Sequence, residues 1–173
     1  AHVSMVTHPL HGGVKLYLST IRNLRPLLAR ITVAERFDVI HLHHLVSALA
    51  TNLWRKSKKF PKVYTFHAGY FLEYMDARGL TRRTLAAKVR WRADRFNLRR
   101  AKKIVCLSEF TRGQIREHWP QEAGKIVLVP GGVDLERFTA EGEGSRQMAR
   151  GELKLPVDRK ILFTVRRLEP RMG

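Results

Sequence analysis

The sequence predicts an α/β fold built on a parallel sheet, and two observations lead to this prediction. Short apolar runs recur along the chain, and each has the length of a strand; they cover 37–43, 62–66, 104–107 and 125–129. Stretches with helical spacing of apolar residues separate them, over 45–56, about 80–101 and 108–118. Apolar strands that alternate with helices are typical of a parallel sheet covered on both faces.

Individual residues support these elements. The helix expected over 45–56 has Leu45, Leu49 and Leu53 at helical spacing and basic residues at its end, where the helix dipole favours them. Ser108 is in position to cap the helix that Pro120 ends. A further strand is expected over 2–7.

A change in composition predicts the domain organisation. Residues 140–145 are acidic, rich in glycine and without an apolar face, as in an exposed linker. A short helix (145–153) and a new strand (160–165) are expected after it. We therefore predict an N-terminal domain over 1–138, a linker over 139–151, and the start of a second domain over 152–173.

Composition limits the classes of function. Hydrophobic residues make up 44% of the 173 residues, which favours a folded chain, and no apolar run approaches the ~20 residues of a membrane span. The 33 Lys and Arg against 15 Asp and Glu give a net charge of +18, which predicts a partner rich in negative charge: nucleic acid, anionic lipid or a phosphorylated small molecule. The single cysteine, Cys106, forms no intrachain disulfide and is expected to be a buried apolar residue.

Much of this charge lies in one stretch, 81–103, where Asp94 is the single acid. Its ten basic residues are Arg82, Arg83, Lys88, Arg90, Arg92, Arg95, Arg99, Arg100, Lys102 and Lys103. Its apolar residues form a stripe of Leu85, Val89, Ala93 and Phe96, widened by Trp91 and Leu98. Three interpretations stay open: a helix with this stripe in the core and a solvated basic face, a helix at a lipid surface, or a nucleic-acid contact.

Histidines follow the expected strands, at the edge where parallel sheets bind ligands. His41 and His43 alternate onto one face of their strand, and His67 follows the next strand, before the small residues Ala68 and Gly69. The three imidazoles could form a metal site. Because no carboxylate or cysteine joins them, we favour hydrogen-bonding roles and predict no metal.

The end of the chain carries a basic loop. The strand expected over 160–165 leads into Arg166, Arg167 and Arg171, before Gly173. Guanidinium groups between a strand and a helix are suited to a bidentate grip on a diphosphate.

Five segments together resemble the large retaining GT-B glycosyltransferases often called group 1 or family four. The segments are 37–44, 63–67, 101–111, 129–138 and 167–173. They occur in the family's order and spacing, and the resemblance extends from about residue 30 to the end. It implies two Rossmann-like domains facing across a cleft, of which this chain holds the first and only the start of the second.

The resemblance also implies roles for single residues. His67 resembles the family histidine that faces the donor sugar, and Arg167 resembles the arginine on the donor diphosphate. Further residues are expected in the acceptor cleft (His43, His44, Ser108 and Glu109) and in the loop toward the donor domain (Gly131, Gly132 and Asp134). Met172 stands where the family has lysine, and Arg171 is expected to supply that charge. No metal or other cofactor is expected.

We therefore expect a hexosyltransferase that takes a nucleotide-diphosphate sugar and retains anomeric configuration. The family's first strand and its pair of donor-binding glutamates have no counterpart in this sequence, so we expect the chain to be inactive alone. The alternative is a non-catalytic module that binds an acceptor or a membrane surface. The acceptor is expected to be a lipid-linked group or a glycan, with nucleic acid the weaker alternative. The expected location is cytoplasmic, or peripheral at the cytosolic face of a membrane.

Overall fold

The computed structural model describes residues 14–34, 36–69, 71–72, 84–138, 142–163 and 165. The chain divides into two compact units, Ala1–Pro130 and Gly131–Gly173. In chain order the elements are α1 (Val14–Ala34), β1 (Ile40–Leu42), α2 (Leu45–Leu53), the 3-10 helix η1 (Arg55–Lys59), β2 (Lys62–Phe66), α4 (Leu85–Arg100), β3 (Lys103–Cys106), α5 (Glu109–His118), the 3-10 helix η2 (Pro120–Lys125), β4 (Ile126–Leu128) and α6 (Glu143–Glu152). The domain boundaries expected from the sequence stay a prediction.

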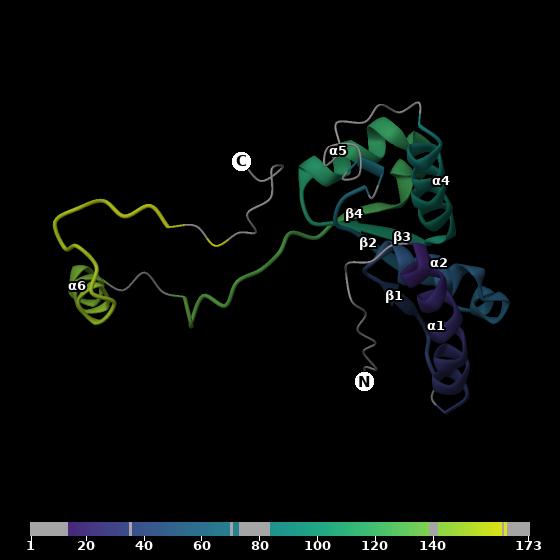
Figure 1. Cartoon of the computed structure of the whole chain (residues 1–173), viewed down its shortest axis with the longest axis horizontal. Coiled ribbons are helices and arrows are strands. Elements are labelled where there is room, and N and C mark those ends of the chain that lie inside the picture. Colours follow the sequence, from purple (N-terminus) through teal and green to yellow (C-terminus); the bar gives the residue numbers. More distant parts are fainter. Residues whose placement is uncertain are drawn as a thin grey trace. The chain divides into compact units, whose positions relative to one another are not determined.

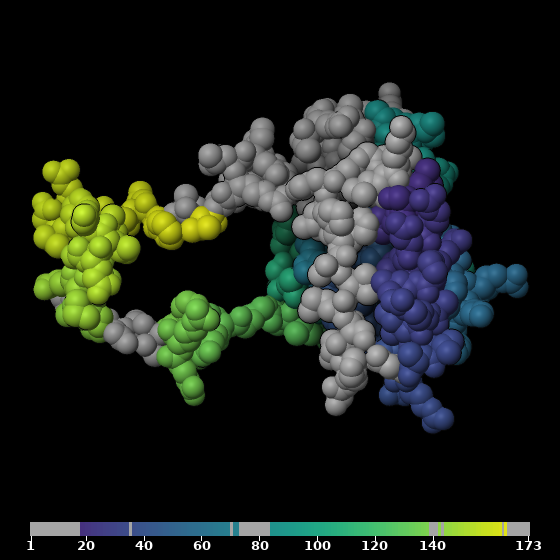
Figure 2. All heavy atoms as spheres, turned by 60° about the horizontal axis from the view of Figure 1, so that its bottom comes forward, coloured from purple at the N-terminus to yellow at the C-terminus, as the bar shows by residue number. Residues whose placement is uncertain are grey.

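The four strands form one parallel sheet in the order β1-β2-β3-β4, which confirms the predicted fold class (Figure 1). Helices α2, α4 and α5 connect the strands in turn, as parallel pairing requires. α1 packs against α2, and α2 packs against α4. α1 has no counterpart among the expected elements; it contains Pro26, a residue that usually breaks helices, and it forms part of the outer surface of the first unit (Figure 2).

The core lies between the sheet and its helices. Its most enclosed side chains are Phe66, Leu98, Ile104, Ile115 and Trp119, each fully buried. Burying side chains of this size contributes about 1.5–3 kcal/mol each. Cys106 belongs to the same cluster as a free thiol, as expected, and burial raises its pKa.

A buried pair of amides joins α2 to α4. The Asn52 side-chain nitrogen donates to Oδ1 of Asn97 at 3.0 Å, and the Asn97 nitrogen donates to the carbonyl of Leu45 at 3.0 Å. Such bonds stabilise the fold because a buried amide without a partner costs about 1–3 kcal/mol. The helix expected over 45–56 ends at Leu53 and continues as η1.

The face of α4 that packs against the core is not the face that carries Leu85 and Val89. Its fully buried positions are Ala87, Asp94, Asn97 and Leu98. Leu85 is 76% exposed and Val89 56% exposed. The interpretation that packs the stripe into the core is therefore wrong for Leu85 and Val89, whereas Leu98, which widens the stripe, is buried.

The second unit contains α6, where a short helix is expected. The Arg150 guanidinium donates to three carbonyls beyond the helix, those of Pro156, Val157 and Arg159, at 2.7–3.0 Å. The strand expected over 160–165 is wrong for residues 160–163 and 165, which have no regular structure. Leu162 is fully exposed there. A strand forms only beside a paired neighbour, and the described residues of this unit contain no strand with which 160–163 could pair.

Candidate functional site

The carboxyl ends of the strands meet at one edge of the sheet. Leu42 pairs with Tyr64, Phe66 pairs with Cys106, and Cys106 pairs with Leu128. The residues that follow these strands therefore share this edge, which is where parallel sheets bind ligands. His43, His67 and Ser108 are among them.

Three histidines form a continuous row at this edge. The rings of His41 and His43 lie 4.1 Å apart between centroids, and those of His43 and His67 lie 5.8 Å apart. The row is anchored at one end, where Nε2 of His41 shares a 2.8 Å hydrogen bond with Oγ1 of Thr65. All three imidazoles remain exposed, so they are accessible to a ligand.

The environment of the row favours the neutral forms of His41 and His67. Burial lowers the pKa of His41 below its usual value of 6.5, and the neighbouring His43 lowers it further. The pKa of His67 is lowered by the same two causes in the same order. A neutral imidazole at pH 7 can accept one hydrogen bond and donate another.

The rings pack side by side in the row. Among the described residues, no group of three or more His, Cys, Asp or Glu side chains is arranged to hold a metal ion. The alternation predicted for His41 and His43 is thus seen in the structure as a contact between their two rings.

Two of the residues expected in the acceptor cleft, His44 and Ser108, also cap the N-termini of helices. The His44 Nδ1 accepts from the backbone N–H of Val46 at 3.3 Å and caps α2. Ser108 caps α5 by a reciprocal pair of bonds, in which Oγ of Ser108 accepts from the N–H of Thr111 and Oγ1 of Thr111 accepts from the N–H of Ser108. Glu109, one residue later, forms an ion pair with Arg112.

The loop after His67 is fastened to α4. The backbone N–H of Phe71 donates to Oδ2 of Asp94 at 2.9 Å, and Asp94 is buried. Gly69 is tightly packed here, since a Cβ on it would lie 3.1 Å from Cδ1 of Leu72. The space left by the absence of a side chain on Gly69 is thus occupied by Leu72.

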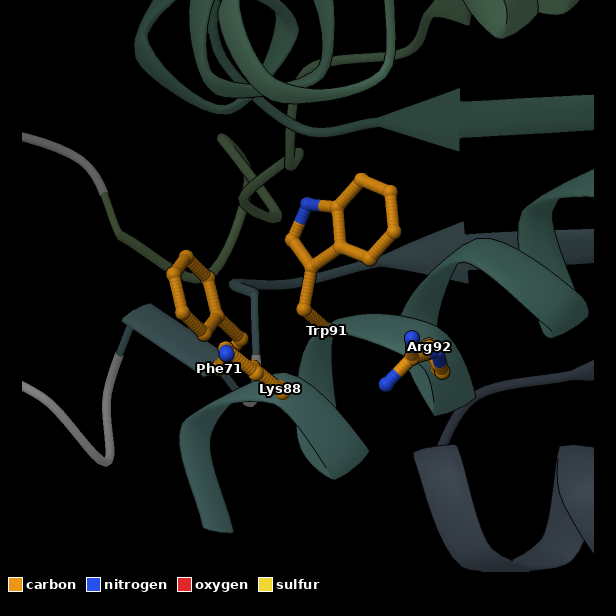
Figure 3. A pocket seen from close by; sticks show the side chains of 4 residues that line it. All are labelled: Phe71, Lys88, Trp91 and Arg92. Carbon is orange, nitrogen blue, oxygen red and sulfur yellow. The ribbon is translucent and has the colours of Figure 1, made fainter. Parts of the chain in front are cut away.

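A hollow of about 320 Å³ lies beside this loop (Figure 3). Its lining consists of Phe71 from the loop and of Lys88, Trp91 and Arg92 from α4. Trp91 stacks on Trp119 with 6.4 Å between ring centroids. The hollow thus combines aromatic surfaces with two cations.

The residues expected on the donor side are only partly described. Gly131 and Gly132 are exposed in the second unit, and a Cβ on either would meet no other atom. The Asp134 carboxylate accepts from the backbone N–H groups of Glu136 and Arg137, so it stabilises a turn. Arg82, Arg83, Arg167, Arg171 and Met172 lie outside the described residues.

Sequence reasoning missed two residues that organise the site. Thr65 anchors the histidine row, and Asp94 fastens the loop after His67. For Asp94 a signal was available, because it is the single acid beside ten basic residues in the stretch 81–103. No sequence signal marks Thr65, since its role depends on the pairing of β1 with β2.

A parallel sheet with this row at its carboxyl edge defines a Rossmann-like domain, the class that binds ligands at that edge. A sequence profile described as Glycosyltransferase Family 4 matches residues 1–137. The match covers well over half of the chain. The chain therefore belongs to glycosyltransferase family 4.

Several curated relatives are named D-inositol 3-phosphate glycosyltransferase. The chain is 26% identical to the one from Nocardiopsis dassonvillei over 135 residues, which cover 78% of this chain and 30% of the relative. It is 29% identical to the one from Actinosynnema mirum over 140 residues, covering 78% and 31%. The relative from Corynebacterium efficiens is 25% identical over 190 residues, covering 99% and 41%. The chain thus spans between 30% and 41% of the length of these relatives.

Proposed function

We propose that the protein transfers a sugar from a nucleotide-diphosphate donor to an acceptor, with retention of anomeric configuration. In this reaction the bond from the anomeric carbon to phosphate oxygen breaks, and its electron pair leaves with the diphosphate. The acceptor hydroxyl oxygen forms the new bond, and its proton passes to an oxygen of the leaving diphosphate. The observation that supports the proposal best is the exposed histidine row at the carboxyl edge of a family 4 domain.

In this proposal His67 faces the donor sugar near the reacting carbon. Its lowered pKa supports this role, because a neutral ring adds no competing charge and can hydrogen-bond a sugar hydroxyl. His43, His44, Ser108 and Glu109 line the acceptor side. For His44 and Ser108, the helix-capping bonds keep these side chains in place at the edge.

The leaving diphosphate requires positive charge in the transition state. We assign this role to Arg167 and Arg171, with Gly131 and Gly132 in the loop toward the donor domain. No metal ion or other cofactor is needed in this proposal, since the guanidinium groups neutralise the diphosphate. The names of the relatives favour a phosphorylated polyol as acceptor. A lipid-linked or glycan acceptor is the alternative.

The test is turnover of a nucleotide sugar by the protein extended to the full length of its relatives. We expect His67→Ala to lower kcat by about 100-fold or more, as loss of a side chain acting at the reaction centre does. Lys58→Ala, an exposed change on η1, is the control and should keep full turnover. Release of the nucleoside diphosphate measures the rate. Unchanged turnover by His67→Ala would exclude the proposed role.

A second candidate function is a non-catalytic module that binds a surface through α4. The exposed apolar and basic residues of α4 favour it. The same assay separates the two candidates, because a module without catalysis releases no diphosphate from any nucleotide sugar.

A further inference from the structure

The exposed residues of α4 all lie on one side of the helix. They are Leu85, Lys88, Val89, Arg92, Arg99 and Arg100. With 3.6 residues per turn, these positions fall within roughly 60° on either side of a single line along α4. The half-buried Phe96 lies on the same line, and we call these seven residues the outer face. The buried residues Ala87, Asp94 and Leu98 occupy the opposite side.

The outer face is amphipathic in itself. Leu85 is 76% exposed and Val89 is 56% exposed, so the described part of the chain covers neither. The guanidinium of Arg100 lies 5.0 Å from the centre of the Phe96 ring. An apolar line flanked by cations is the pattern of helices that lie at the interface of a bilayer.

The cations of this face are not neutralised within the described part of the chain. The one acid of α4, Asp94, points to the core and binds the N–H of Phe71. No described carboxylate lies within ion-pair distance of Arg92, Arg99 or Arg100. Because clustered cations repel one another, a negatively charged partner from outside would relieve this repulsion.

The arginines also form a hollow. Arg92, Arg95, Phe96, Arg99 and Arg100 line a space of about 470 Å³. Guanidinium groups bind phosphate oxygens in pairs, so the space is suited to one or more phosphate groups.

The hollow is separate from the histidine row. α4 ends at Arg100, just before β3 begins, so its last turn lies at the amino edge of the sheet, opposite His67. The backbone N–H of Lys102 donates to the carbonyl of Lys62 at the start of β2, which fixes this position. The 16 residues of α4 extend about 24 Å from there toward the loop that follows His67.

We propose that the outer face of α4 binds the surface of an anionic phospholipid bilayer. Arg92, Arg99 and Arg100 bind lipid phosphates, and Leu85 and Val89 enter the boundary between headgroups and acyl chains. The two aliphatic side chains favour a bilayer over a nucleic acid, whose backbone offers them no apolar partner. Binding of this kind does not depend on sugar transfer, so either proposal can fail alone.

Co-sedimentation of the purified chain with vesicles tests the proposal. Phosphatidylcholine vesicles with phosphatidylserine should bind the chain, and vesicles of phosphatidylcholine alone should not. The triple change Arg92→Gln, Arg99→Gln, Arg100→Gln should weaken partition roughly 100-fold, since each cation near the surface contributes about fivefold. Leu85→Ser with Val89→Ser should also weaken partition and leave its salt dependence in place.

The matched control removes the same charge elsewhere. Arg55, Lys56 and Lys58 are exposed on η1, and replacing all three with Gln lowers the net charge equally. If this control loses as much binding as the α4 variant, net charge and not the outer face is responsible, and the proposal is wrong. Equal binding to neutral vesicles would also overturn it. If single-stranded RNA, and not vesicles, binds in a way that the α4 change abolishes, the face is a nucleic-acid site instead.

Discussion

At the level of single residues, the histidine row shows how neighbours set chemical state. His41, His43 and His67 come from two strands, and their rings contact one another in sequence. Protonating one ring makes protonation of the next less favourable, which adds to the effect of burial. The row thereby favours the neutral forms of His41 and His67 at the carboxyl edge of the sheet.

This coupling predicts a pH dependence of stability. The folded pKa values of His41 and His67 lie below the ordinary value of 6.5, so the unfolded chain binds more protons between these values and 6.5. Their contribution to the free energy of unfolding is therefore fully present above pH 6.5 and decreases as the pH falls through that window. Urea unfolding at a series of pH values measures the decrease.

His43→Gln is the variant that isolates the coupling. It should raise the pKa of both His41 and His67 toward 6.5, because it removes the charge that opposes their protonation, and the loss of stability on acidification should become smaller. Burial remains, so the recovery is incomplete. Histidine Cε1 shifts in an NMR titration report the two pKa values directly. Values that do not move would show that His43 has no electrostatic effect on its neighbours.

At the level of elements, α4 shows how packing decides which face of a helix is buried. Its buried face is mixed, with the apolar Ala87 and Leu98 beside the polar Asp94 and Asn97. Ala87 allows close packing, Leu98 fills the core, and Asp94 receives the N–H of Phe71. Leu85 and Val89 face outward.

A pair of substitutions tests which face is buried. Leu98→Ala should lower the free energy of unfolding by about 2–5 kcal/mol, because it leaves a cavity in the core. Val89→Ser should change it by less than about 0.5 kcal/mol, as exposed substitutions do. Chemical denaturation of the two variants beside the parent measures both. A large loss of stability for Val89→Ser would place the stripe in the core after all.

At the level of the whole molecule, charge is the dominant property. A net charge of +18 on 173 residues opposes compaction through self-repulsion. α4 places four of the cations, Lys88, Arg92, Arg99 and Arg100, on its outer face. No helix in the described ranges is long and apolar enough to cross a membrane.

Salt should therefore stabilise the protein. Raising ionic strength from about 0.01 M to about 0.15 M shortens the screening length from about 30 Å to about 8 Å. We expect Tm to rise by about 3 °C, the shift that corresponds to roughly 1 kcal/mol for a chain of this size. Differential scanning calorimetry measures it. The variant with Arg92, Arg99 and Arg100 changed to Gln should show a smaller rise, and an equal rise would mean that repulsion is not concentrated on α4.

Much of the fold follows from local patterns. The buried strands β2 and β3 are recognisable because each is a mostly apolar run after a lysine, and α5 because Ser108 and Pro120 mark its ends. The strand expected over 160–165, which residues 160–163 and 165 do not form, shows the limit of such patterns. An apolar run forms a strand only when another strand supplies its hydrogen-bond partners, and this information is not in the run itself.

The candidate site likewise combines features that the sequence predicts with features that only the folded chain shows. Amino-acid order alone specifies which residues follow each strand, and parallel topology then brings His43, His67 and Ser108 to one edge. The order of residues also specifies the net charge and the family. Two contacts between distant residues are visible only in the folded chain: Thr65 with His41, and Asp94 with Phe71. The outward direction of Leu85 and Val89 is also visible only there. The physical reason is that a periodic pattern defines the faces of an element, whereas packing against the rest of the molecule selects which face leaves the water.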